Sequence, residues 1–139
     1  MRALLDTNIV LDLLLKREPF AQDAAAIWEA NRQGRFDGYV SAITPITVFY
    51  VARKTTSAID AQQMVRDILK AFRVCILNLN VLRAALRLPL ADYEDAVQLA
   101  SALAHGLDAI VTRDLQDFTG ATLPVFSPAD FLKQLPVAQ

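Results

Sequence analysis

Residues 1–8 read MRALLDTN, and this stretch is the strongest indication of the fold in the sequence. An apolar run that stops on an acid predicts a buried strand over residues 1–5 with Asp6 at its carboxyl end. In open α/β sheets, ligands bind in the crevice beyond the carboxyl ends of the strands. Asp6 is therefore the first candidate site residue, although an acid followed by Thr7 and Asn8 can equally cap the next helix.

The composition indicates one folded domain over residues 1–139. The chain is 54% hydrophobic with a mean hydropathy of +0.29, which excludes a disordered polypeptide. Its longest apolar run, residues 9–15, is far shorter than the roughly 20 residues of a membrane helix, and an early acid is untypical of a secretory signal. We therefore expect a cytoplasmic protein with no membrane-bound part. The net charge of −1 argues against a surface that is basic throughout, as in many nucleic-acid-binding proteins.

Apolar runs with β-forming residues alternate along the chain with segments of helical periodicity. The pattern predicts strands over residues 1–5, 37–41, 74–77, 109–112 and 125–126. It predicts helices over residues 9–15, 20–33, 44–54, 60–72, 80–88, 92–105 and 127–135. Such alternation is typical of right-handed crossovers. The predicted fold class is α/β, a three-layer α/β/α domain with a central parallel sheet.

Acids from distant parts of the chain are expected to meet at one edge of this sheet. The carboxyl ends of parallel strands share an edge, and the acids placed there are Asp6, Asp92, Asp95, Asp114 and Asp117. Carboxylates gathered in this way repel one another unless a hard cation such as Mg²⁺ or Mn²⁺ lies between them. Each also has a structural alternative: Asp92 and Asp95 form a capping pattern, and Asp114 and Asp117 suit a turn. Capping and metal binding do not exclude each other.

Three other residues are interpreted as having no direct part in a reaction. Asp12 on the first helix is expected to be solvated, with a supporting role beside Asp6 as the alternative. His105 precedes a helix-ending glycine, where a cation favours the helix dipole, and no nucleophile motif accompanies it. Cys75 lies within an apolar run and is expected to be a small buried hydrophobe.

Three separated motifs resemble the PIN-domain family, which includes VapC-type toxins of toxin–antitoxin pairs. They are LLDTNIVLDLLLKREPF at 4–20, YVSAITPITVFYVARK at 39–54 and DYEDAVQLASALAHGLDAIVTRDLQDF at 92–118. The resemblance keeps the family's order and spacing over nearly the whole chain. It implies a small parallel-sheet domain that hydrolyses RNA phosphodiesters with Mg²⁺ or Mn²⁺, and suggests an antitoxin partner. It also suggests a homodimer formed through helices such as 44–54 and 60–72.

The resemblance also implies roles for individual residues, carried over by motif. The catalytic metal ligands would be Asp6, Asp95 and Asp114, accompanied by Asp92 and Asp117. The residues that orient these ligands would be Asn8, Ser41 and Thr112. The candidates for holding the RNA backbone are Arg17, Arg53, Lys54 and Arg113, each of which can instead be a solvated surface charge.

One position departs from the family pattern. The family usually has an acid in the helix after Ser41, where this chain has Thr47, and no acid occurs between Asp37 and Asp60. A site with one carboxylate fewer holds a second cation less well. The alternative function is therefore a catalytically weakened or inactive module that binds RNA or protein. A receiver-type signalling domain with an acidic pocket also suits the fold pattern.

Overall fold

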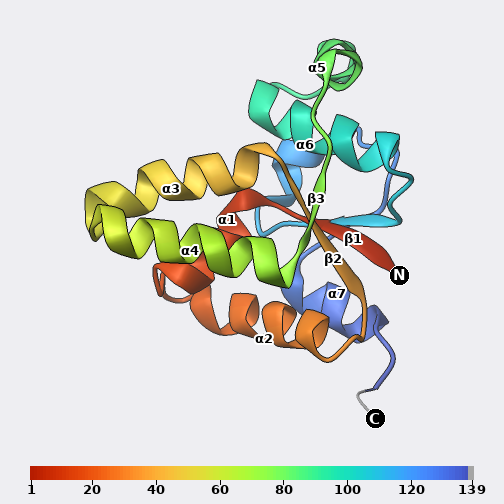
Figure 1. The fold of residues 1–139 in the computed structure, drawn as a ribbon. Coiled ribbons are helices and arrows are strands. Elements are labelled where there is room, and N and C mark those ends of the chain that lie inside the picture. Colours follow the sequence, from red (N-terminus) through yellow and green to blue (C-terminus); the bar gives the residue numbers. More distant parts are fainter. Residues whose placement is uncertain (138–139) are drawn as a thin grey trace.

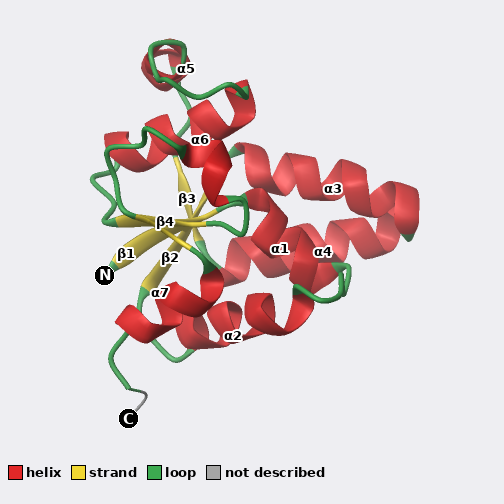
Figure 2. Ribbon diagram, turned by 180° about the vertical axis from the view of Figure 1, so that it is seen from behind, coloured by secondary structure: helices red, strands yellow, loops and turns green. Residues whose placement is uncertain are grey.

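The computed structural model describes residues 1–137 and confirms the predicted α/β class with its central parallel sheet. The sheet has five strands in the order β3-β2-β1-β4-β5, and every neighbouring pair is parallel. The strands are β1 (Arg2–Leu5), β2 (Asp37–Ser41), β3 (Arg73–Cys75), β4 (Ala109–Val111) and β5 (Val125–Phe126). Figure 2 shows them between two layers of helices.

Helices cover both faces of the sheet. They are α1 (Thr7–Leu14), α2 (Ala21–Arg32), α3 (Ile43–Thr55), α4 (Ala58–Ala71), α5 (Leu79–Ala85), α6 (Tyr93–Ala104) and α7 (Pro128–Gln134), with a 3-10 helix η1 (Leu115–Phe118). The helices α5 and α6 lie over one face, and α1, α2 and α7 lie over the other (Figure 1). The pair α3 and α4 extends away from the sheet as an arm.

The alternating side chains of β1 explain this layering. Ala3 and Leu5 belong to the core cluster that includes Ile27 of α2 and Phe131 of α7, whereas Leu4 packs with Leu99 of α6. Successive residues of a strand point to opposite faces, so three apolar residues in a row serve two cores. Ala3, Leu4 and Leu5 are therefore buried on both faces of the sheet, as the sequence pattern predicts.

The order of the strands places the ends of β1 and β4 at a topological switch point. The chain runs from β1 outward through β2 to β3 and then returns to the other side of β1 as β4. The backbone N–H of Asp6 donates to the carbonyl oxygen of Val111 (2.9 Å), so the two strands end side by side. Crevices at such switch points are the usual ligand sites of open α/β sheets.

Several element boundaries differ from those predicted. The helix α4 begins at Ala58 because the Ser57 hydroxyl accepts the backbone N–H of Asp60. The cap of α5 is Asn78, which accepts the backbone N–H of Val81, and not Asn80. The strand β3 ends at Cys75, so Ile76 and Leu77 lie outside it.

The prediction that Cys75 is a small buried hydrophobe is confirmed, and His105 lies at the end of α6, as expected of a structural residue. Cys75 is fully buried, and burial raises the pKa of its thiol to about 11. The Nε2 of His105 accepts the backbone N–H of Ile76 (3.1 Å), and its Nδ1 lies 3.0 Å from the carbonyl oxygen of Ser101. His105 therefore ties the segment after β3 to the end of α6. No helix within residues 1–137 is long and apolar enough to cross a membrane.

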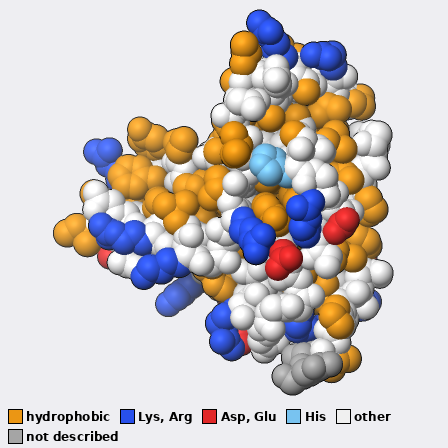
Figure 3. Space-filling view, turned by 45° about the vertical axis from the view of Figure 1, so that its right-hand side comes forward, with side chains coloured by type: hydrophobic (Ala, Val, Ile, Leu, Met, Phe, Trp, Pro, Cys, Tyr) orange, Lys and Arg blue, Asp and Glu red, His pale blue; other side chains and the backbone are white. Residues whose placement is uncertain are grey.

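The arm formed by α3 and α4 exposes apolar side chains. Ile46, Tyr50 and Leu69 are more than half exposed, and Figure 3 shows hydrophobic side chains over this arm beside a row of Lys and Arg side chains. These are the two helices through which the sequence suggests a homodimer, which stays a prediction.

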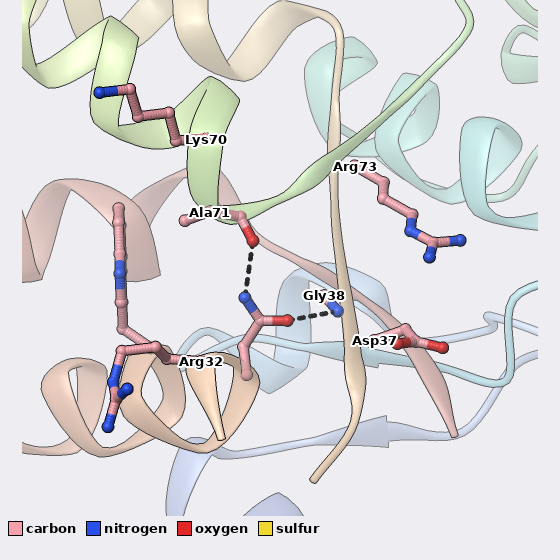
Figure 4. Close-up of a pocket in the computed structure, with 8 residues that line it drawn as sticks. Arg32, Asp37, Gly38, Lys70, Ala71 and Arg73 are labelled. Atoms are coloured by element: carbon pink, nitrogen blue, oxygen red, sulfur yellow. Dashed lines mark hydrogen bonds between the residues drawn. The ribbon is translucent and has the colours of Figure 1, made fainter. Parts of the chain in front are cut away.

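At the opposite edge of the sheet from Asp6, one side chain joins three elements. The amide of Asn31 at the end of α2 donates to the carbonyl oxygen of Ala71 (2.8 Å) and accepts the backbone N–H of Gly38 (2.8 Å). Figure 4 shows both bonds across a cavity of about 340 Å³. The charged ends of Arg32, Lys70 and Arg73 point in different directions there. The cavity is therefore a structural junction whose cations do not converge on a ligand.

Candidate functional site

A pocket of about 370 Å³ opens beyond the carboxyl end of β1. Five carboxylates line it: Asp6, Asp92, Glu94, Asp95 and Asp117. The other lining residues are Thr7, Asn8, Leu11, Arg17, Thr47 and Val51. Of the five carboxylates, Asp6 follows the central strand, three come from the start of α6 and its cap, and Asp117 comes from η1. The fold thus gathers acids from both ends of the sequence.

Asp6 is held in place by two side chains from other elements. It is 4% exposed, and its carboxylate accepts the Thr112 hydroxyl (2.8 Å) and the Gln98 amide (3.1 Å). Although Asp6 occupies the cap position of α1, its side chain accepts no capping hydrogen bond from that helix. Asp6 is thus the cap of α1 by position, while its side chain is held by Thr112 and Gln98 and lines the pocket.

Burial and charge both perturb Asp6. Desolvation raises its pKa above the usual value, the hydrogen bonds from Gln98 and Thr112 act in the opposite direction, and the charge of Asp114 raises it further. A buried carboxylate with acidic neighbours favours the protonated form unless a cation offsets the charge. A cation bound beside Asp6 would therefore stabilise its charged form.

The start of α6 contributes three acids. The carboxylate of Asp92 accepts the backbone N–H of Asp95 (3.0 Å), so the predicted cap exists and Asp92 lines the pocket as well. Burial raises the pKa of Asp95 to about 7, with further contributions from Asp6, Asp92, Asp117 and Glu94. Burial also raises the pKa of Glu94, aided by Asp92 and Asp6. Repulsion among these acids therefore adds to burial in favouring their protonated forms.

Asp114 approaches Asp6 from the other side and does not line this pocket. One of its oxygens accepts the Asn8 amide (3.3 Å), and the other lies 3.5 Å from Arg113. Its backbone N–H donates to the Thr112 hydroxyl (3.0 Å). Thr112 therefore contacts both Asp6 and Asp114, and Asn8 contacts Asp114. Thr112 and Asn8 are two of the three residues expected to orient the metal ligands.

The prediction that Asp12 is solvated is wrong. Its side chain is 1% exposed and accepts the Nε of Arg113 (2.7 Å). Arg17 lies 3.8 Å from the same carboxylate. A buried carboxylate requires such partners because an unpaired charge away from water is very costly. The guanidinium of Arg113 also stacks on Phe20, 4.0 Å from the ring centre.

The remaining predicted residues lie at other places. The hydroxyl of Ser41 is buried and accepts the backbone N–H of Ile43 at the start of α3. Arg53 and Lys54 are exposed in the last turn of α3. Of the four predicted RNA-binding cations, Arg17 alone lines the pocket. Thr47 lines the α3 side of the pocket, where the family pattern has an acid.

Sequence reasoning missed two residues of the site. Gln98 donates to Asp6, lies 3.5 Å from Asp95 and accepts the backbone N–H of Thr7 (3.2 Å). Its signal was its position, three residues after Asp95 on the same face of α6. Glu94 was passed over although it lies within the acidic run DYED.

The donor chemistry of the pocket fits a hard divalent cation, because Mg²⁺ and Mn²⁺ prefer carboxylate oxygens and water. Within the part of the chain that the structure describes, no three His, Cys, Asp or Glu side chains are arranged to hold an ion as they stand. Side-chain rotation would have to bring the carboxylates together around a cation. Asp6 is the fixed member, since its two hydrogen bonds hold it.

Solved structures with the same fold include chains from toxin–antitoxin systems. A toxin–antitoxin complex from Klebsiella pneumoniae aligns at 28% identity and a TM-score of 0.68, covering 91% of this chain and 97% of that chain. VapBC2 from Rickettsia felis, bound to a fragment of its promoter DNA, aligns at 15% identity and 0.71, covering 91% and 98%. VapC20 from Mycobacterium tuberculosis, a toxin that cleaves the sarcin–ricin loop, aligns at 13% identity and 0.64, covering 78% and 86%.

A comparison with curated protein sequences gives no significant match. The family model described as PIN domain matches residues 2–116, which contain β1 to β4 and every acid that lines the pocket except Asp117. Because this match spans most of the sequence and the fold agrees with that of the solved neighbours, the chain belongs to the PIN domain family.

Proposed function

We propose that the protein is an endoribonuclease that uses Mg²⁺ or Mn²⁺ to hydrolyse RNA phosphodiester bonds. The observation that carries the proposal is the buried Asp6, held by Thr112 and Gln98 at the edge of a pocket lined by four further acids. Membership of the PIN domain family, together with the cleavage of the sarcin–ricin loop by VapC20, supports the choice of RNA as substrate.

Asp6, Asp95 and Asp114 would hold the cation, with Asp92 and Asp117 beside them. When bound, a divalent cation offsets charge on the phosphoryl oxygens and makes water a better nucleophile at neutral pH. The chain's own part is to fix Asp6 through Thr112 and Gln98 and to fix Asp114 through Asn8. Glu94 adds negative charge to the same wall of the pocket.

Arg17 is the cation of the pocket wall and would contact the RNA backbone. It lies 3.8 Å from Asp12 and its side chain is 35% exposed, so it is loosely paired and accessible. An acidic pocket repels phosphate, and an arginine at its rim provides a bidentate donor for phosphate oxygens. Arg53 and Lys54 would contact RNA farther along α3.

The toxin–antitoxin complex from Klebsiella pneumoniae supports an antitoxin partner for this chain. We infer a VapC-type toxin that such a partner neutralises, and a homodimer that forms through α3 and α4. The exposed Ile46, Tyr50 and Leu69 on these helices are the apolar side chains that such an interface would cover.

Cleavage of structured RNA by the purified protein tests the proposal. We expect Mn²⁺-dependent products that disappear with EDTA and with Asp6→Asn, whereas Asp60→Asn on the exposed start of α4 should cleave like the wild type. Cleavage that survives both EDTA and Asp6→Asn would refute a carboxylate-held cation.

A second candidate function is a module that binds RNA or protein with weak or no catalysis. Thr47 in the pocket wall favours it, because α3 contributes no acid to the pocket. A shortage of one carboxylate would lower the affinity for a second cation. If this explains weak activity, Thr47→Glu should raise Mn²⁺ affinity in calorimetry, while Thr55→Glu at the end of the same helix should not. Unchanged affinity in Thr47→Glu would exclude the missing carboxylate as the cause.

A further inference from the structure

Arg113 donates two hydrogen bonds to Asp12, a carboxylate that has no part in the proposed reaction. Its Nε and Nη2 lie 2.7 and 3.4 Å from the two oxygens of Asp12, which is 1% exposed. Such a fork of two donors fixes the plane of the guanidinium as well as its position. Phe20 lies under the other side of the group, 4.0 Å from its central carbon.

The remaining nitrogen of this fixed group lies beside Asp114. The Nη1 of Arg113 lies 3.5 Å from Oδ1 of Asp114, and the Asn8 amide donates to Oδ2 of the same carboxylate (3.3 Å). Asn8 and Asp12 are one turn apart on α1 and so share a face of that helix. This face of α1 thus contacts Asp114 directly through Asn8. It also holds Arg113, through Asp12, beside the same carboxylate.

We propose that Arg113 is a positioning residue that holds the Asp114 carboxylate at the cation site and is itself held by Asp12 and Phe20. This inference rests on the proposed function, since it takes Asp114 as a cation ligand. It replaces the role predicted from the sequence, in which Arg113 binds the RNA backbone. If Arg113 turned to a phosphate, the buried Asp12 would lose both of its hydrogen-bond donors and keep only the more distant Arg17, 3.8 Å away.

Mn²⁺ affinity, RNA affinity and thermal unfolding of two variants test the inference. Arg113→Gln alone would leave the buried Asp12 with Arg17, 3.8 Å away, as its remaining ion-pair partner, so the first variant is the double substitution Asp12→Asn with Arg113→Gln. It removes one charge of each sign and keeps the net charge. The second is Arg113→Lys, which keeps the charge beside Asp12 but loses the planar fork. Arg32→Gln is the control, because Arg32 forms its ion pair with Glu29 on the surface.

We expect both variants to bind Mn²⁺ about 10–100-fold more weakly in calorimetry, as is typical when an outer partner of a metal ligand is lost. Their affinity for RNA in EDTA should stay within about twofold of the wild type, and Arg32→Gln should leave Mn²⁺ affinity unchanged. A purely structural role would lower the melting temperature alone. A loss of RNA affinity with normal Mn²⁺ binding would restore the RNA-binding role and overturn the inference.

The inference and the proposed function fail differently in this experiment. A wild-type protein that binds no Mn²⁺ would refute the proposed cation site and the inference with it. A wild type that binds Mn²⁺ and loses it with Asp6→Asn would support the site. If both Arg113 variants then bound Mn²⁺ like the wild type and unfolded cooperatively, the positioning role alone would be wrong.

Discussion

At the scale of single residues, Thr112 connects two acids of the site. Its hydroxyl donates to Asp6 and accepts the backbone N–H of Asp114, so one atom sets the distance between two acids that come from different strands. The hydroxyl is fully buried, which makes both bonds strong relative to exposed ones. The motif predicted Thr112 as an orienting residue, and the structure supplies these two contacts.

Replacement of Thr112 by valine removes both hydrogen bonds at nearly constant volume. We expect Mn²⁺ affinity to fall by about 10–100-fold and the free energy of unfolding to fall by about 1–3 kcal/mol. Thr55→Val is the matched control, since Thr55 is exposed at the end of α3 and should change neither quantity measurably. Calorimetry and urea unfolding measure the two effects. Normal Mn²⁺ affinity in Thr112→Val would show that Asp6 needs no such support.

The raised pKa values predict how stability depends on pH in the absence of a cation. Burial raises the pKa of Asp95 from 3.8 to about 7 and raises that of Asp6 as well. A carboxyl group whose pKa rises on folding stabilises the folded state at low pH and loses that contribution as the pH rises through its folded value.

In EDTA, the melting temperature of the wild type should therefore fall between about pH 4 and about pH 7, relative to that of Asp95→Asn. The difference between the two proteins isolates Asp95 from other titrating groups. Scanning calorimetry at several pH values provides the measurement. A difference that stays constant over this range would contradict the raised pKa.

At the scale of elements, the sequence predicted the strands and helices well because burial on two faces leaves a strong apolar pattern. Asp37–Ser41 was predicted to the residue. The errors occurred where a local choice existed, as between Asn78 and Asn80 for the cap of α5. The prediction that Asp12 is solvated failed for a different reason. Its partner Arg113 lies 101 positions away in the sequence, and no local pattern reveals such a contact.

The junction at Asn31 makes a prediction about how α2 is attached. Its amide satisfies the carbonyl of Ala71 and the N–H of Gly38, so Asn31→Ala leaves both groups without their partner. The free energy of unfolding should fall by about 1–3 kcal/mol, with Mn²⁺ affinity unchanged because the site lies at the other edge of the sheet. In contrast, the exposed Asn80 should tolerate alanine within about 0.5 kcal/mol. Equal losses in both variants would remove the special role of Asn31.

At the scale of the whole molecule, the pocket is far more acidic than the chain as a whole. The pocket collects five acids and a single arginine, although the net charge of the chain is only −1. On the face shown in Figure 3, Lys and Arg side chains are more prominent than acids. Overall composition therefore hides the local field, because a nearly neutral chain contains a strongly acidic pocket. The proposed RNA substrate would need a cation in the pocket, or Arg17 at its rim, to offset this repulsion.

The most direct test of the cation site is a crystal of the protein soaked in Mn²⁺ and measured for anomalous scattering. We predict a peak bound by Asp6, with Asp95 or Asp114 turned toward it, and its loss in Asp6→Asn crystals. One peak would agree with a pocket to which α3 contributes Thr47 and no acid. A second peak would show that Thr47 does not prevent the binding of a second cation. The absence of any peak at Asp6, or a peak that persists in Asp6→Asn, would contradict the assignment of this pocket as a cation site.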